Sequence, residues 1–100
     1  MIAWSVQGNS GVAWTIEYRQ DIQKSLKKLD HATRQRIRVF LEERVAKLDD
    51  PRQIADRLQG SELGQYWRFR VGDFRIICDI QEQRLVVLVL EIGHRREIYR

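Results

Sequence analysis

The sequence predicts an α+β domain in which an N-terminal strand, an α-helical hairpin and a three-stranded antiparallel meander follow one another, with the helices packed on one face of the sheet. Two observations lead to this fold class. Apolar residues alternate with a period of two near the start of the chain and recur at helical spacing in its middle. Three strand signals then follow one another toward its end. A length of 100 residues fits one domain.

The predicted first strand begins at Val12, where apolar side chains alternate with smaller or polar ones in the period of a half-buried strand. The alternating residues are Val12, Trp14, Ile16 and Tyr18. Residues 1–11 contain a Gly-Asn-Ser-Gly turn sequence and are compatible with an extra edge strand, a flexible extension or an upstream start codon. We therefore divide the chain into a leader or flexible extension, residues 1–11, and a single domain, residues 12–100.

Two helices are predicted after this strand. Ile22, Leu26 and Leu29 recur at helical spacing, and Asp30 can cap the start of a second, longer helix that ends before Pro51. The stripe of the longer helix contains Ile37, Phe40, Leu41, Arg44, Val45 and Leu48. The link between the helices is short, so we expect them to lie antiparallel as a hairpin over the sheet.

The meander is predicted from the segments YWRFRV, FRIICDI and RLVVLVLEI. Gly72 and Asp73 fit a two-residue turn between the first two strands, and the polar segment 81–83 fits a turn between the second and third. With the first turn in place, Arg70 lies opposite Arg75 on one face of the sheet. Period-two alternation adds Arg68 to this face.

The second hairpin is predicted to bring the C-terminal residues close to Arg68, Arg70 and Arg75. Its register puts Arg75 roughly opposite Leu90, so that Gly93, His94 and Arg95 lie just beyond the first turn. The predicted patch then contains Arg68, Arg70, Arg75 and Arg95, with Tyr99 close behind. Guanidinium groups held together repel one another unless an anion lies among them, and phosphate matches their paired donors.

A second interpretation of these arginines stays open. Arginine alternating with apolar residues on an edge strand protects a sheet against aggregation. The carboxylates of Asp79, Glu91 and Glu97 are also candidates to neutralise part of the cluster.

Composition limits the function classes. The formal charge of +4 and the pI near 9.6 favour an acidic partner such as nucleic acid or an acidic polypeptide. The single cysteine, Cys78, lies in an apolar stretch where a buried thiol fits, which favours a reducing compartment. No apolar run is long enough to cross a bilayer, so we expect a cytoplasmic protein with no membrane partner. No Cys, His and carboxylate cluster has metal-ligand spacing, so we expect no metal and no cofactor.

From Val12 onward the chain resembles the RelE/ParE superfamily of bacterial toxins, and in particular the RelE-like messenger-RNA endonucleases. The segments that carry the resemblance are AWTIEY, RLQG, YWRFRVGDFRIICDI and GHRREIY. The resemblance implies a compact RelE-like fold, binding in the ribosomal A site and metal-independent cleavage of the exposed codon. It also implies a cognate antitoxin that holds the toxin inactive, with operator DNA contacted only indirectly through that antitoxin.

The resemblance also implies residue roles. It makes Arg68 and Arg70 the basic pair of the first meander strand and Arg75 the phosphate-binding arginine, and it matches Arg95 and Tyr99 to the arginine and tyrosine of the tail. RNA cleavage requires the 2′-hydroxyl to lose its proton, the phosphorane to be stabilised and the departing 5′-oxygen to gain a proton. The hypothesis makes Tyr99 the general base, acidified by Arg68 and Arg70. Arg75 then holds the phosphorane. Arg95 orients the scissile phosphate and supplies a proton to the departing oxygen, directly or through water.

Three features depart from the best-known family pattern. Arginines stand where lysines are usual at the first two site positions, the tail before the tyrosine is shorter, and His94 replaces a common lysine. Imidazole titrates near neutrality, but alternation places His94 on the face opposite Arg95. An auxiliary or structural role for His94 is therefore favoured over a catalytic one.

Two other functions remain open. One is a ParE-like, non-enzymatic toxin that inhibits DNA gyrase with the same fold, and the other is an inert nucleic-acid-binding module. Translation arrest distinguishes the endoribonuclease from the gyrase inhibitor, whose expression triggers DNA-damage signalling. An inert module would bind RNA in a salt-sensitive way without stopping growth.

Overall fold

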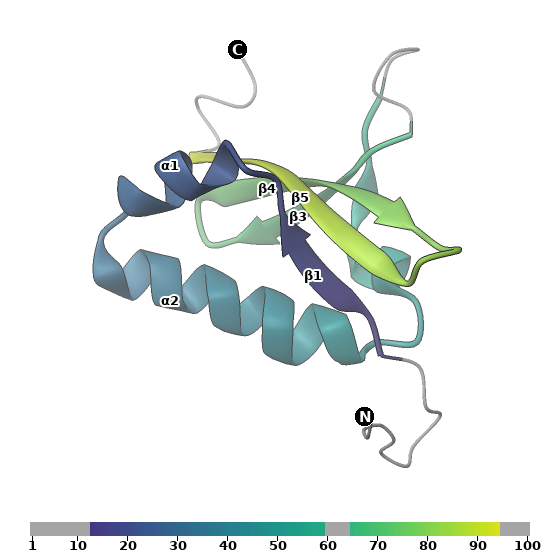
Figure 1. The fold of residues 1–100 in the computed structure, drawn as a ribbon. Coiled ribbons are helices and arrows are strands. Elements are labelled where there is room, and N and C mark those ends of the chain that lie inside the picture. The colour runs from purple at the N-terminus through teal and green to yellow at the C-terminus, as the bar shows by residue number, and fades with distance from the viewer. Residues whose placement is uncertain (1–12, 60–64, 95–100) are drawn as a thin grey trace.

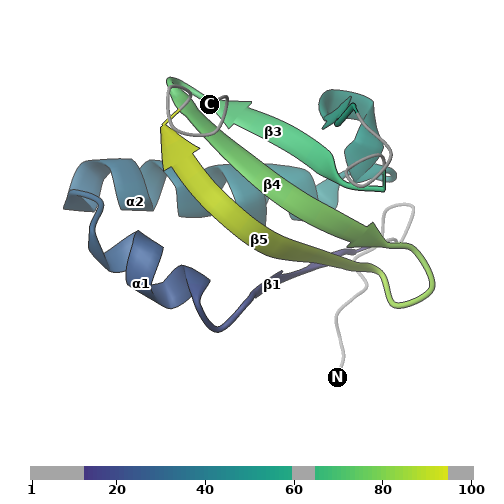
Figure 2. The same cartoon turned by 90° about the horizontal axis from the view of Figure 1, so that it is seen from above.

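A computed structural model of the chain describes residues 13–59 and 65–94, so the predicted leader, residues 1–11, lies outside the described residues. Within these ranges, five strands form one sheet in the order β1-β5-β4-β3-β2. The strands are β1 (Thr15–Tyr18), β2 (Asp56–Arg57), β3 (Trp67–Val71), β4 (Phe74–Gln81) and β5 (Val86–His94). Helix α2 crosses one face of this sheet (Figures 1 and 2). The α+β class and the one-sided helical layer are thereby confirmed.

The helical hairpin consists of α1 (Ile22–Lys27) and α2 (His31–Val39), which run in opposite directions (Figure 1). Asp30 caps α2 as predicted, because its carboxylate accepts hydrogen bonds from the backbone nitrogen of Thr33 at 3.2 Å and from its hydroxyl at 2.6 Å. The helix continues through a π-helical turn, Phe40–Arg44, and a 3₁₀ turn, Val45–Lys47. None of the described helices is long and apolar enough to cross a membrane.

The buried part of the predicted helical stripe faces the sheet, whereas Arg44 is exposed and Leu48 lies just beyond the last helical turn. Ile37, Leu41 and Val45 are spaced four residues apart and are fully buried. The sheet meets them with Phe69 of β3, whose ring lies edge-on to that of Phe40 at 6.0 Å between centroids. The other fully buried core residues of β4 and β5 are Ile76, Cys78, Val87 and Val89. The predicted burial of the Cys78 thiol is confirmed.

Strand β1 joins the sheet beside β5 and parallel to it, with Thr15 opposite Val86. The other strand pairs are antiparallel, so the sheet is mainly antiparallel, as predicted. The Tyr18 hydroxyl donates to Glu42 at 2.6 Å and links β1 to the end of the helical layer. Burial, and then this hydrogen bond, raise the pKa of Tyr18 above its ordinary value.

The first hairpin of the meander has the predicted register. Val71 lies opposite Phe74, and Arg70 lies opposite Arg75. Gly72 has a φ of +59° at the first position of the two-residue turn, a conformation that glycine adopts without steric cost.

The second hairpin differs from the prediction. Arg75 lies opposite Gly93 rather than near Leu90. Strand β4 continues through Gln81, and the turn occupies residues 82–85 instead of 81–83. A β-bulge, where Ile77 and Cys78 of β4 change register with β5, shifts the pairing by one more residue. Strand β5 therefore extends to His94.

Candidate functional site

Three arginines lie on the face of the sheet that is turned away from α2. Phe69 and Val71 of β3 are buried in the core beneath the helix, so Arg68 and Arg70 between and beside them point to the opposite face. Arg75 of β4 is the direct cross-strand neighbour of Arg70 and shares that face. We call the surface of Arg68, Arg70 and Arg75 the arginine patch. It lies at the end of the sheet formed by the β3–β4 turn.

Arg75 differs from its neighbour in burial. Only 9% of Arg75 is exposed, whereas the Arg70 side chain is 60% exposed. Nη1 of Arg75 donates to the carbonyl oxygens of Gly72 and Phe74, both at 3.2 Å. Arg75 is therefore a fixed cation that supports the backbone of the turn, while Arg70 presents its guanidinium to solvent.

The β3–β4 turn is also held from the helix side. A Cβ atom added to Gly72 would lie 3.1 Å from Nη1 of Arg36, so the guanidinium of this α2 residue approaches the turn closely. The turn thus lies between an arginine of α2 and the buried arginine of β4.

Asp56 is the site residue that sequence reasoning missed. Its Oδ2 accepts a hydrogen bond from Nη2 of Arg68 at 3.0 Å and lies 3.5 Å from Nε of Arg70. The hydrogen bond from Arg68, together with the positive charge of Arg70, holds the pKa of Asp56 below its ordinary value. Asp56 therefore remains ionised at neutral pH and partly neutralises the arginine patch.

The position of Asp56 depends on β2. This two-residue strand pairs with β3 and places Asp56 directly opposite Arg68. On the other face of the same pair, the guanidinium of Arg57 lies over the Trp67 ring, 5.7 Å from its centroid. So short a strand has no readable period, and its only signal in the sequence is an acidic residue in a polar loop.

The three carboxylates proposed from the sequence as neutralising groups have different outcomes. Asp79 accepts a hydrogen bond from the side-chain amide of Gln81 at 2.9 Å. Glu91 is exposed on β5 opposite Ile77, so by alternation it lies on the same face as Arg75. Glu97 lies outside the described residues. Among the described residues, no group of three or more His, Cys, Asp and Glu side chains could hold a metal ion.

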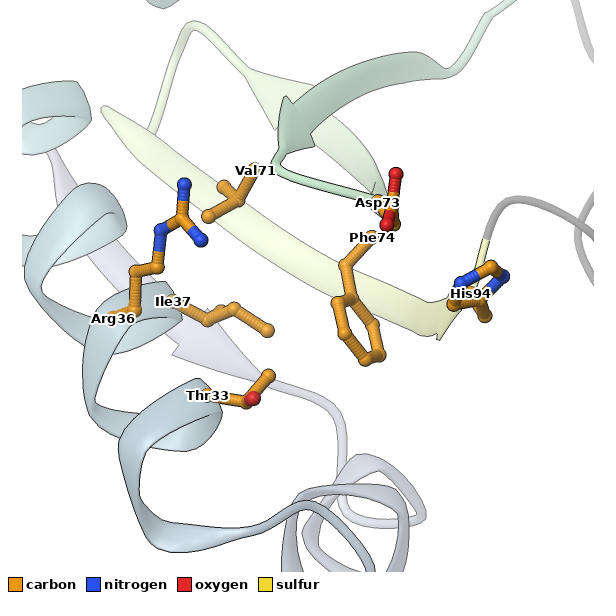
Figure 3. A pocket seen from close by; sticks show the side chains of 7 residues that line it. All are labelled: Thr33, Arg36, Ile37, Val71, Asp73, Phe74 and His94. Carbon is orange, nitrogen blue, oxygen red and sulfur yellow. The ribbon is translucent and has the colours of Figure 1, made fainter.

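Arg95 and Tyr99 also lie outside the described residues, so their places in the site remain predictions. His94 is the last described residue and stands opposite Phe74, with the two rings edge-to-face at 5.7 Å between centroids. Both rings line a pocket of about 280 Å³ on the helix side of the sheet (Figure 3). Its lining residues are Thr33, Arg36, Ile37, Val71, Asp73, Phe74 and His94. The imidazole therefore lies on the opposite face from the arginine patch.

Comparisons with known proteins agree with the fold. The family model described as ParE toxin of the type II toxin–antitoxin system parDE matches residues 16–99. No curated protein sequence is significantly similar to the chain.

Solved structures are similar over most of the chain. The toxin–antitoxin complex RelBE2 from Mycobacterium tuberculosis matches with a TM-score of 0.76 and 19% identity, over 88% of this chain and 98% of that one. The archaeal RelE–RelB complex from Pyrococcus horikoshii OT3 matches at 0.66 and 23%, over 83% and 96%. The isolated E. coli RelE toxin matches at 0.63 and 17%, over 82% and 84%. The chain therefore belongs to the ParE toxin family of type II toxin–antitoxin systems, within the RelE/ParE superfamily.

Proposed function

We propose that this toxin is a ribosome-dependent endoribonuclease that cuts messenger RNA in the A site. The cross-strand pair of Arg70 and Arg75, with Arg68 on the same face, carries the proposal. Cations brought together on one face favour an anion, and guanidinium groups match the paired oxygens of a phosphate. An RNA backbone supplies such phosphates in a row.

The proposed reaction is attack of a 2′-hydroxyl on the adjacent phosphate. Arg75 is fixed and buried, so it is suited to stabilise the charge of the phosphorane without reorganising. The exposed Arg70 is accessible to the incoming phosphate. In this proposal Tyr99 takes the proton of the 2′-hydroxyl, Arg68 and Arg70 favour its ionised form, and Arg95 orients the scissile phosphate. Attack of the 2′-oxygen breaks the bond between phosphorus and the 5′-oxygen and leaves a 2′,3′-cyclic phosphate. The departing 5′-oxygen takes its proton through water bound by Arg95. The cleavage then uses side chains of the protein and no metal.

In this proposal the ribosome is the partner that positions the messenger RNA at the arginine patch. Guanidinium groups retain their protons, so Arg68, Arg70 and Arg75 are poorly suited to act as general acid or base near neutral pH. Such a site depends on alignment of the attacking oxygen with the phosphate, which a ribosome-bound messenger can supply. We therefore expect free RNA to be cut poorly.

A cognate antitoxin is the second proposed partner. The similar structures from Mycobacterium tuberculosis and Pyrococcus horikoshii are complexes of a toxin with an antitoxin. A chain with a formal charge of +4 suits an acidic, amphipathic segment of such a partner. In this proposal operator DNA is contacted only through the antitoxin.

The alternative function is inhibition of DNA gyrase without catalysis. The family model that matches residues 16–99 is that of the ParE toxin, and this observation favours the alternative. The two functions differ in the cellular process that the toxin disturbs first. An endoribonuclease stops translation, whereas a gyrase inhibitor triggers DNA-damage signalling while messenger RNA stays intact.

The test is to map cuts in ribosome-bound messenger after brief induction of the toxin. Arg70→Ala removes an exposed guanidinium from the arginine patch, and we expect it to reduce cutting by about 100-fold, as for loss of one donor to a transition-state oxyanion. Arg84→Ala is the matched control, because Arg84 is an exposed arginine in the β4–β5 turn, at the opposite end of β4 from the arginine patch. The proposal would be contradicted if the Arg70→Ala variant cut messenger at the wild-type rate. It would also be contradicted if the toxin triggered DNA-damage signalling while messenger stayed intact.

The assignment of the general base has its own test. Tyr99→Phe removes only the phenolic oxygen, so a base at this position predicts a large loss of cutting with RNA binding retained. Should Tyr99→Phe leave ribosome-dependent cutting and growth arrest intact, another group is the base.

A further inference from the structure

Asp56 contributes a carboxylate to the centre of the arginine patch. One of its oxygens, Oδ2, contacts both Arg68 and Arg70. The same oxygen therefore has the position and charge that a phosphate oxygen would need in order to bind these two guanidinium groups. Within the described residues, Asp56 is the carboxylate that forms ion pairs with these arginines.

The two contacts are unequal. The contact with Arg68 is a hydrogen bond of 3.0 Å to a side chain that is only 19% exposed. The contact with Arg70 is 3.5 Å long, and that side chain is 60% exposed. An exposed ion pair of this length contributes little free energy and exchanges its partner readily. A competing anion should therefore replace Asp56 at Arg70 before it does so at Arg68.

The backbone keeps Asp56 in place while such an exchange occurs. Strand β2 pairs Asp56 with Arg68 and Arg57 with Trp67, and the Arg57 guanidinium packs over the Trp67 ring on the opposite face. The pair of Asp56 and Arg68 thus belongs to the sheet framework. The Arg70 guanidinium is the part of the patch that can turn toward a ligand.

We propose that Asp56 is a positioning residue that acts as an internal anion. Its carboxylate occupies the phosphate position at Arg70 until RNA displaces it. It remains hydrogen-bonded to Arg68 throughout. This inference rests on the proposed function, because it concerns RNA as the ligand of the arginine patch. Arg68 is then fixed by Asp56, and Arg70 is the residue that exchanges one anion for the other.

The exchange has a measurable consequence for affinity. The carboxylate competes for Arg70 and repels a phosphate a few ångströms away, so its removal should tighten RNA binding. Asp56 is half exposed, so water screens its charge strongly. For charges about 5 Å apart at an effective dielectric constant of about 50–80, the repulsion corresponds to roughly a three- to tenfold change in Kd. The salt dependence of binding should also steepen, by up to about 0.7 in the logarithmic slope, because one more cation becomes available to a single-stranded backbone.

The experiment uses the full chain, purified without antitoxin, and a short oligouridylate whose 2′-hydroxyl groups are methylated to prevent cleavage. Its Kd is measured against salt concentration for the wild type and Asp56→Asn. Glu82→Gln is the matched control, because it also removes one charge from a carboxylate paired with an arginine, at 3.2 Å from Arg52. We expect the three- to tenfold tightening for Asp56→Asn and a change of less than about twofold for Glu82→Gln.

A double-mutant cycle with Arg70→Ala tests the site of action. If Asp56 competes for Arg70, the tightening caused by Asp56→Asn should fall to less than about twofold in the Arg70→Ala background. An effect of equal size in both backgrounds would mean that only the net charge matters, and the inference would be overturned.

Two further outcomes separate this inference from the proposed function. Unchanged RNA binding by Asp56→Asn overturns the inference. A loss of messenger cutting together with the rising, acid-side limb of its pH profile also overturns it, because that result would make Asp56 a catalytic base. Neither result affects the proposed function if the wild type still cuts ribosome-bound messenger. If the wild-type toxin does not cut ribosome-bound messenger, only the proposed function is contradicted. The displacement of Asp56 by a methylated oligonucleotide requires no cleavage, so the inference about Asp56 can still hold.

Discussion

At the scale of the residue, two turns of the meander use a left-handed backbone with different consequences. Gly72 has a φ of +59° and Leu85 a φ of +53°. Glycine adopts this conformation without a clash between Cβ and the carbonyl oxygen, whereas a leucine is strained there. Leu85 is also 39% exposed, so little core packing offsets its strain. The sequence predicted the glycine turn but contains no glycine to mark the second one.

We expect Leu85→Gly to raise the free energy of unfolding by about 0.5–1 kcal/mol, because relief of backbone strain exceeds the entropy that glycine gains on unfolding. The reverse change at the other turn, Gly72→Ala, should lower it by about 1–2 kcal/mol, since the new Cβ is strained and approaches Arg36. Urea unfolding of both variants measures these values. Destabilisation by Leu85→Gly would show that its side chain packs more favourably than its exposure indicates.

The lowered pKa of Asp56 predicts that the stability of the protein depends on pH. Its folded pKa lies below the unfolded value because of Arg68 and Arg70, so the unfolded chain takes up this proton first as the pH falls. The contribution is therefore complete above about pH 5 and is lost as the pH falls through the lowered folded pKa. Because Asp56 is half exposed, Asp56→Asn should cost only about 0.5 kcal/mol at pH 7. The difference in urea midpoint between wild type and variant should shrink near pH 3, and a constant difference would contradict this linkage.

At the scale of the element, the helical layer follows the sequence closely. The period of the apolar residues identified the buried stripe of Ile37, Leu41 and Val45, and Asp30 identified the start of the helix. The extent of regular α-helix was less predictable, since it changes to a π-helical turn at Phe40. The period of the stripe tolerates this change because the same face remains against the sheet.

A matched pair of truncations on this layer tests the stripe. Leu41→Ala removes a fully buried side chain that contacts the sheet, and we expect a loss of about 2–5 kcal/mol in unfolding free energy. Val39→Ala, two residues earlier and 42% exposed, should change it by less than about 0.5 kcal/mol. Thermal and urea unfolding provide the measurement. Similar losses for the two variants would contradict the packing of this face.

The two hairpins differ in how well their strand register could be predicted from the sequence. Gly72 and Asp73 set the first register, because a two-residue turn leaves one pairing of Arg70 with Arg75. The second turn is longer, and a bulge between Ile77 and Cys78 adds a further shift. Several apolar residues in a row on β5 allow either register locally. Burial of one face against the helices, rather than local pattern, selects the observed one.

At the scale of the whole molecule, the order β1-β5-β4-β3-β2 sets which regions open first. Strands β4 and β5 pair along most of their lengths in the interior of the sheet, while β2 is a two-residue edge strand. Local opening requires least free energy where few buried contacts are lost.

We therefore expect the backbone amides of β4 and β5 to exchange with deuterium most slowly, and those of β2 to exchange fastest among the strands. The edge strand β1 should fall between them, since it is held by β5 and by the bond from Tyr18 to Glu42. Hydrogen exchange followed by NMR or mass spectrometry gives the order. Protection of β2 equal to that of β4 would show that the arginine patch is more rigid than its short edge strand indicates.

The sequence by itself determined what depends on neighbours a few residues apart: the helical stripe, the cap at Asp30, the tight turn at Gly72 and the face shared by Arg70 and Arg75. Only the tertiary structure decided which distant segments meet. It placed β1 beside β5 and brought Asp56 to Arg68. The physical reason is that turns and caps are governed by local hydrogen bonds and sterics, whereas the pairing of distant strands is chosen by burial of their common face.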